Sequence, residues 1–165
     1  MVSTRPDIAY ATSLVSRYMA NLGKRHWKTT KWIMRYLKGT SNSKLMYQQL
    51  PNSKPEPIGY VNSDYVGDLD KRRSLSGYIF LYGRYVLSWK ATLQSVVALS
   101  TTEAEFIALS EAVKEGLWLK GLLCDLGIKK NIIEEKQVEV LKLHTSENAF
   151  DMLTKTYSAQ TSEVP

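Results

Sequence analysis

The chain of 165 residues has little of what several classes of protein require. It has one cysteine, Cys124, so it can form neither an internal disulfide nor a cysteine-cluster zinc site. No apolar run approaches the roughly 18 residues of a membrane-spanning helix, and the first residues lack the apolar stretch of a secretory signal. We therefore expect an intracellular protein, cytoplasmic or nuclear and not secreted, with no membrane partner and no disulfide-linked partner.

Acidic residues are scarce in the first 50 positions. That segment holds nine Lys or Arg residues and a single acid, Asp7, whereas the rest of the chain holds 13 basic and 15 acidic residues. Apolar residues make up 44% of the sequence and charged residues 23%, the mixture of a globular protein with one core. The uneven charge predicts a basic arm that meets a polyanion and a body that carries carboxylates.

Two helices are expected in the basic arm. Apolar residues recur every three or four positions over residues 7–20 and again over 24–38, and Gly39 is a candidate left-handed terminator of the second helix. Five basic residues recur along the second helix at intervals of four, three, four and three: Lys24, Lys28, Lys31, Arg35 and Lys38. This basic stripe is either a solvated face or a phosphate-binding surface, and Trp27 and Trp32 lie close to it in the sequence.

A proline-rich linker, residues 51–57, separates the arm from the body. Beyond it, short runs rich in β-branched and aromatic residues predict an antiparallel meander. The runs cover residues 58–61, 75–82, 85–89 and 94–99.

A long helix follows the meander. Ser100 and Glu103 have the spacing of a capping box, the helix is expected to run to about Asp125, and Gly127 lies just past its end. Alternation over residues 138–143 predicts a last strand, and a short helix is expected at about 147–155.

Five strings of the sequence resemble, in order, the C-terminal end of the copia-type LTR retrotransposon Pol polyprotein. They read TRPDIAYATSLVSRYM, HWKTTKWIMRYLKGT, GYVNSDYVGDLDKRRSLSGYIF, SWKATLQSVVALSTTEAEFIAL and ENAFDMLTK. The resemblance implies reverse transcriptase connection helices over residues 1–50, the linker, and an RNase H-like domain over 58–156, with 157–165 as a disordered tail. Met1 is then expected to be an internal methionine of a polyprotein.

The fold that the resemblance implies is α+β, a truncated RNase H-like fold. An N-terminal helical pair precedes a mixed sheet of about four strands with a long helix packed on it. The family has a fourth strand and a following helix at the place that corresponds to residues 131 and 132 of this chain. This chain has neither, so we interpret it as internally deleted. We expect residues 138–143 to fill the gap by pairing parallel to the first strand, in the sheet order third, second, first, last.

The same resemblance implies four acids around two Mg²⁺ ions. Asn62 occupies the position of the family's metal-bridging aspartate, and Asp64, two residues on, is either a substitute ligand or a turn residue. The glutamate of the long helix is matched by Glu105 in preference to Glu103, and the fourth acid is matched by Asp151. The third acid falls in the deletion, so the metal ligands expected here are Asp64, Glu105 and Asp151.

The two histidines offer little to a metal. His26 matches an HW pair of the family and is expected to pack in the second helix, and His144 ends the last expected strand.

Three functional interpretations follow. The first is a degenerate fragment whose ancestral RNase H activity, cleavage of RNA in RNA–DNA hybrids, is lost. The alternative is a nucleic-acid-binding module that uses the basic stripe without catalysis, with an RNA–DNA hybrid or another polyanion as partner. The third is residual Mg²⁺-dependent nuclease activity.

Overall fold

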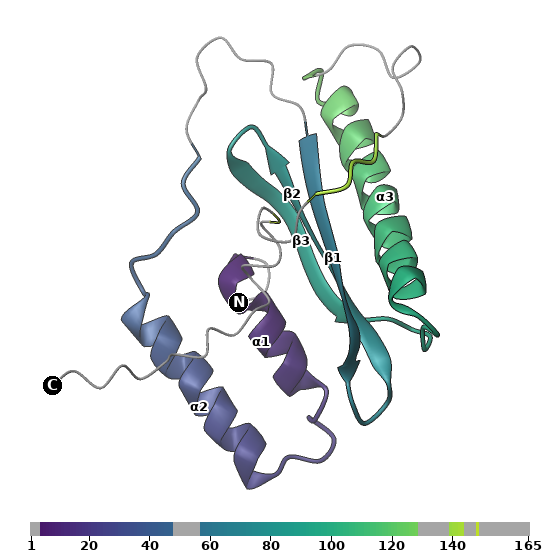
Figure 1. The fold of residues 1–165 in the computed structure, drawn as a ribbon. Helices are drawn as coiled ribbons and strands as arrows, with labels where there is room; N and C mark the ends of the chain where they lie inside the picture. The colour runs from purple at the N-terminus through teal and green to yellow at the C-terminus, as the bar shows by residue number, and fades with distance from the viewer. Residues whose placement is uncertain (1–3, 48–56, 129–138, 144–147, 149–165) are drawn as a thin grey trace, which may run out of the picture.

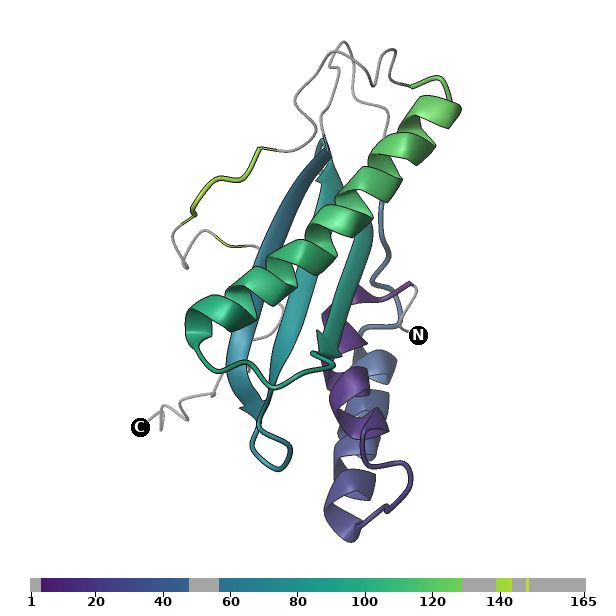
Figure 2. The same cartoon turned by 90° about the vertical axis from the view of Figure 1, so that its right-hand side faces the viewer.

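A computed structural model describes residues 4–47, 57–128, 139–143 and 148 of the chain. Its described part is α+β: three helices and one three-stranded antiparallel sheet. The long helix α3 covers one face of the sheet, and helices α1 and α2 lie on the other side, with α1 against β3 (Figure 1 and Figure 2).

The sheet is a meander in the order β1-β2-β3, built from β1 (Pro57–Asp68), β2 (Arg73–Tyr82) and β3 (Tyr85–Leu93). Gly83, with φ of +65°, permits the two-residue turn between β2 and β3. The β1–β2 turn is held by the buried Asp68 side chain, whose Oδ1 accepts hydrogen bonds from the backbone N–H of Asp70 and Lys71. Short connections therefore fix both hairpins.

Helix α3 (Thr101–Asp125) is closed at both ends by the residues that the sequence indicates. The Ser100 hydroxyl accepts from the Glu103 N–H at 3.1 Å, while the Glu103 carboxylate accepts from the Leu99 N–H at 2.7 Å. Gly127 has φ of +69°, and the N–H groups of Gly127 and Ile128 donate to Cys124 and Leu123. That pair of bonds is a Schellman motif, which satisfies the last carbonyls of the helix.

The core lies between α3 and the sheet. Tyr78 and Phe80 of β2 pack on Ala112 and Leu119 of α3, with Val61 of β1 beside them. The small side chains of α3 let the helix approach the strands closely. Burial, followed by the nearby Glu115 carboxylate, raises the pKa of the Tyr78 hydroxyl to about 12.

The arm consists of α1 (Pro6–Ser16) and α2 (Lys24–Gly39). α1 buries only Ile8 and Ala9, and α2 buries no residue. The two helices are joined mainly by polar contacts, which are described with the site below.

Three sequence predictions about the fold are wrong. The sheet has three strands, because residues 139–143 form no regular secondary structure and their side chains are exposed. The run at 94–99 is also irregular, and the buried Gln94 side chain donates to Ser76 Oγ and to the Ala104 carbonyl instead of continuing a strand. Gly39 is the last residue of α2 and is not left-handed; Thr40 caps the helix.

Candidate acidic site and nucleic-acid interface

The two polar residues expected at the acidic site of β1 lie on the face of the sheet that is turned away from α3. Val61 packs into the core under α3, and side chains alternate along a strand, so Asn62 and Asp64 point to the opposite face. The Asn62 Oδ1 atom accepts a hydrogen bond of 2.9 Å from the Ser63 N–H. This amide oxygen is already engaged with the backbone.

Asp64 lies beside a bulge in β1. The register between β1 and β2 shifts between Asp64 and Asp68, and Val66 within the bulge has φ of +55°. A Cβ atom added to Gly67 would lie 2.7 Å from Asp64 Oδ2, so the carboxylate is folded over this glycine. Asp64 is nevertheless a strand residue paired with Leu75 of β2 and not a turn residue, and its role as a metal ligand stays a prediction.

The glutamates of α3 stand apart from these groups. Glu103 is a capping residue, as described above. Glu105 is exposed, next to Ala104, which is buried against the sheet. Because α3 covers one face and Asp64 points from the other, the structure does not bring Glu105 and Asp64 together.

A two-metal site is not supported by the residues that the structure describes. Among them, no group of three His, Cys, Asp or Glu residues is placed to hold a metal ion. Asn62 brings no charge, and Asp64 and Glu105 extend from different layers. Asp151 and His144 lie outside the described residues, so the prediction that Asp151 is a ligand stays a prediction.

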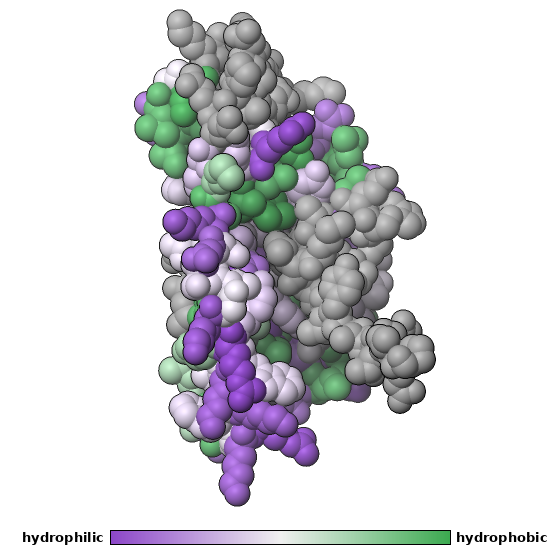
Figure 3. All heavy atoms as spheres, turned by 90° about the vertical axis from the view of Figure 1, so that its left-hand side faces the viewer, coloured by the Kyte–Doolittle hydropathy of each residue, from purple (hydrophilic) through white to green (hydrophobic). Residues whose placement is uncertain are grey.

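The basic stripe lies on α2, on the side of the molecule where Figure 3 shows a row of hydrophilic side chains. Its five cations, Lys24, Lys28, Lys31, Arg35 and Lys38, are all exposed. The ion pairs within the described ranges join Arg5 to Asp7 and Lys90 to Glu111, so neither involves the stripe. The positive charge of this face is therefore not neutralised by those acids.

The opposite side of α2 is turned toward α1 and the turn that follows it. His26 stacks on Tyr18, with ring centroids 4.2 Å apart, and its Nδ1 accepts from the Gly23 N–H at 3.0 Å. This confirms the expected packing role of His26. The Tyr36 hydroxyl donates to Asp7 Oδ2 at 2.9 Å, so α2 presents its basic stripe away from the rest of the arm.

Asp7 is the centre of a polar cluster that the sequence analysis did not assign. Arg5 donates two hydrogen bonds to the Asp7 carboxylate, at 2.9 and 2.6 Å, and also reaches the Thr40 hydroxyl at 2.7 Å. The hydrogen bond from Arg5, ahead of that from Tyr36, holds the pKa of Asp7 below its usual value. The sequence did contain a signal for this cluster, because Asp7 is the single acid among the first 50 residues.

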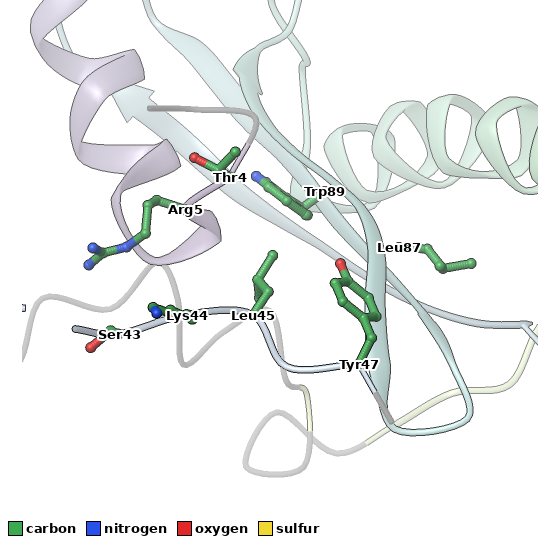
Figure 4. A pocket seen from close by; sticks show the side chains of 8 residues that line it. All are labelled: Thr4, Arg5, Ser43, Lys44, Leu45, Tyr47, Leu87 and Trp89. Carbon is green, nitrogen blue, oxygen red and sulfur yellow. The ribbon is translucent and has the colours of Figure 1, made fainter. Parts of the chain in front are cut away.

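A pocket of about 480 Å³ lies where the segment after α2 passes β3 (Figure 4). Trp89 and Tyr47 contribute aromatic walls, and Arg5 and Lys44 contribute basic groups. Two of these lining groups already have partners: Arg5 binds Asp7, and the Tyr47 hydroxyl donates to the Val86 carbonyl at 3.0 Å. The pocket therefore has few uncommitted polar groups with which to orient a ligand.

Among the residues that the structure describes, no helix is long and apolar enough to span a bilayer.

Comparison with known proteins finds one kind of relative repeatedly. The chain is 39% identical to the retrovirus-related Pol polyprotein from transposon TNT 1-94 of Nicotiana tabacum, over 94% of this chain and 14% of that protein. It is 34% identical to the Pol polyprotein from transposon RE2 of Arabidopsis thaliana, over 76% of this chain and 8% of that protein. The chain thus corresponds to a small part of these polyproteins.

A shorter relative matches along most of its own length. Secreted RxLR effector protein 161 of Plasmopara viticola is 40% identical over 72% of this chain and 82% of that protein. No family model matches the chain, and no solved structure matches it significantly.

The alignment with the tobacco polyprotein is longer than this chain. It extends over 191 aligned positions but uses 94% of a 165-residue chain, so roughly 36 aligned positions have no counterpart here.

Proposed function

The chain belongs to the family of retrovirus-related Pol polyproteins from copia-type transposons, and on that premise we propose that it is a degenerate fragment whose ancestral ribonuclease H activity is lost. The observation that carries the loss is the state of the β1 acids. Asn62 stands where the resemblance implies an aspartate and uses its Oδ1 on the Ser63 N–H. Two-metal hydrolysis of a phosphodiester needs carboxylates that converge on both ions, and this strand supplies an amide instead.

The layers of the fold support the same proposal. By strand alternation Asp64 points to the face of the sheet opposite α3, which carries Glu105, and this separation argues against an ion shared by the two expected ligands. By the resemblance, this chain also lacks the segment that would carry the third acid. Mg²⁺ therefore remains part of the ancestry in this proposal and not of a working site.

The test is hydrolysis of an RNA–DNA hybrid by the purified chain in Mg²⁺ or Mn²⁺. We expect no metal-dependent cleavage by the parent and none by Asn62→Asp, because that change restores one ligand only. Glu105→Ala is the control for contaminating nuclease. Turnover by the parent that disappears in Glu105→Ala would overturn the proposed loss of activity.

A second function, nucleic-acid binding without catalysis, is favoured by the basic stripe. Its five exposed cations lie on the side of α2 that is turned away from α1, and a row of cations on one helix face attracts phosphates by releasing their counterions. A location inside the cell, where nucleic acid is available, is part of this proposal.

Salt dependence tests this second function. The double variant Lys28→Ala/Lys31→Ala should bind an oligonucleotide more weakly, and its slope of log affinity against log salt should fall by about 0.7 to 0.9 for each phosphate contact removed. Lys71→Ala/Lys114→Ala is the matched control, because both lysines are exposed on the body and the change in net charge is equal. Equal slopes for the two double variants would show that the stripe is only a solvated face.

A further inference from the structure

Two tryptophans stand on either side of the basic stripe. At about 100° per residue, the five cations fall within about 40° of Lys24 around the helix. Trp27 then lies about 60° to one side, and Trp32 lies about 80° to the other. The stripe is thus a track of charge between two indole rings.

Both rings are far more exposed than tryptophan usually is. Trp27 is 59% exposed and Trp32 is 57% exposed, although large aromatic side chains are normally buried on average. Burial in the arm does not account for their position, because α2 has no buried residue.

Each ring is paired with a lysine of the stripe. Lys31 Nζ lies 5.6 Å from the centroid of Trp27, and Lys28 Nζ lies 5.5 Å from the centroid of Trp32. At exposed sites a cation–π contact is weak. A phosphate could therefore draw each ammonium group from its ring at small cost and leave the face of the ring open.

We infer that α2 binds single-stranded nucleic acid, with phosphates on the basic stripe and unpaired bases stacked on Trp27 and Trp32. The inference rests on the proposed nucleic-acid binding and adds the class of ligand. A duplex offers the stripe its phosphates but keeps its base faces in the stack, whereas an unpaired base has a free face for an indole. The stripe is about 21 Å long at 1.5 Å per residue, so it can follow several nucleotides of an extended strand.

The surroundings of α2 favour this ligand over an anionic membrane. An interfacial helix must bury an apolar face in the bilayer. The side of α2 opposite the stripe is held by the Tyr18–His26 stack and the Tyr36–Asp7 hydrogen bond. That side is consequently not available to lipid while the arm is intact.

The test compares one sequence as a single strand and as a duplex, by fluorescence anisotropy with labelled oligonucleotides. We expect Trp27→Ala/Trp32→Ala to weaken single-strand binding by about fivefold or more per ring, which corresponds to a stacking contribution of about 1–3 kcal/mol per base. Duplex binding and the salt slope should change little. Trp118→Ala is the matched control, because Trp118 is 60% exposed on α3, away from the stripe.

A conservative pair keeps the test decisive if the alanine variant unfolds. Trp27→Phe/Trp32→Phe retains two rings and should keep most of the single-strand preference, and circular dichroism reports whether the helices persist. Unchanged single-strand binding in the folded alanine variant would overturn the inference while leaving the stripe as a phosphate site. Stronger binding to phosphatidylserine vesicles than to the oligonucleotide would overturn it as well. No binding to single strand, duplex or heparin would remove the proposed nucleic-acid function itself.

Discussion

The body and the arm of this molecule are held together by different forces. In the body, α3 and the sheet enclose aromatic and small apolar side chains, with Tyr78 and Phe80 at the centre. In the arm, α2 buries nothing and is held to α1 by the Asp7 cluster and by one ring stack. Apolar burial is insensitive to charge, whereas several of the polar contacts of the arm meet at the Asp7 carboxylate. The body and the arm should therefore respond differently to cavities, pH and salt.

The largest effect is expected from a cavity in the body. Phe80→Ala removes a ring that is 8% exposed and packs between Gly59 and Gly116. The loss should be about 3–5 kcal/mol in the free energy of unfolding, as for other buried aromatic truncations. Urea denaturation followed by far-UV circular dichroism measures it. A loss below about 1 kcal/mol would show that the body does not rest on this core.

A smaller effect is expected from crowding the same ring. A Cβ atom on Gly59 would lie 2.5 Å from Phe80 Cε1, so Gly59→Ala should destabilise the chain by about 1–3 kcal/mol. Gly121→Ala is the control, because no atom lies within 4 Å of its added Cβ. That change should stabilise α3 by roughly 0.5–1 kcal/mol. The same sign for both variants in denaturation would contradict the close approach of the Phe80 ring to the β1 backbone at Gly59.

The arm should respond to the loss of its carboxylate. Asp7→Asn should cost about 1 kcal/mol, below the roughly 1.5–3 kcal/mol of hydrogen bonds to a charged group, because the Asp7 side chain is 31% exposed to solvent. We expect the amides of α2 to exchange hydrogen faster in this variant, while the exchange rates of the α3 amides stay unchanged. Loss of protection in both helices would mean that the arm and the body unfold together.

The pH dependence of the same contact has a defined sign. The pKa of Asp7 is lowered in the folded protein from an ordinary value of 3.8. Its contribution is therefore present above that value and is lost as the pH falls through the lower, folded pKa. The difference in α2 protection between parent and Asp7→Asn should shrink as the pH drops below 3.8. A constant difference would assign the stabilisation to packing.

The smallest effect is expected from a surface pair of the body. Lys90 and Glu111 are joined at 3.5 Å with the lysine side chain 48% exposed. Lys90→Ala should change the free energy of unfolding by less than about 0.5 kcal/mol, as exposed ion pairs usually do. A larger loss in the free energy of unfolding would show that this ion pair stabilises the body more than exposed ion pairs usually do.

Local signals in the sequence predicted much of the fold. The capping serine and Gly127 fixed α3 within a residue or two, since a cap and a left-handed glycine act on their own backbone. The spacing of the basic stripe predicted an exposed face of α2. The prediction that Gly39 is a left-handed terminator of α2 was wrong because its neighbour Thr40 caps the helix. The Thr40 hydroxyl donates to the Tyr36 carbonyl at 2.7 Å.

Long-range pairing could not be predicted in the same way. Alternation over 138–143 is compatible with a strand but does not name a partner, and residues 139–143 stay exposed. At the outer edge of β1, the Val61 carbonyl accepts instead from the Asn148 side chain at 2.9 Å. The location of the acidic site could not be predicted for the same reason. The register of β1 decides from which face of the sheet Asp64 points, and the spacing of residues in the sequence does not determine that register.

The meander also has a kinetic consequence. Each strand of the body pairs with the next one along the chain, and α3 packs mainly on β1 and β2 of the same meander. Contacts between near neighbours in sequence require little loop closure, and such topologies fold quickly. We therefore expect the body to assemble as soon as residue 125 is available, before any later segment takes part. A chain with this order of assembly can lose a later piece and still reach a folded state.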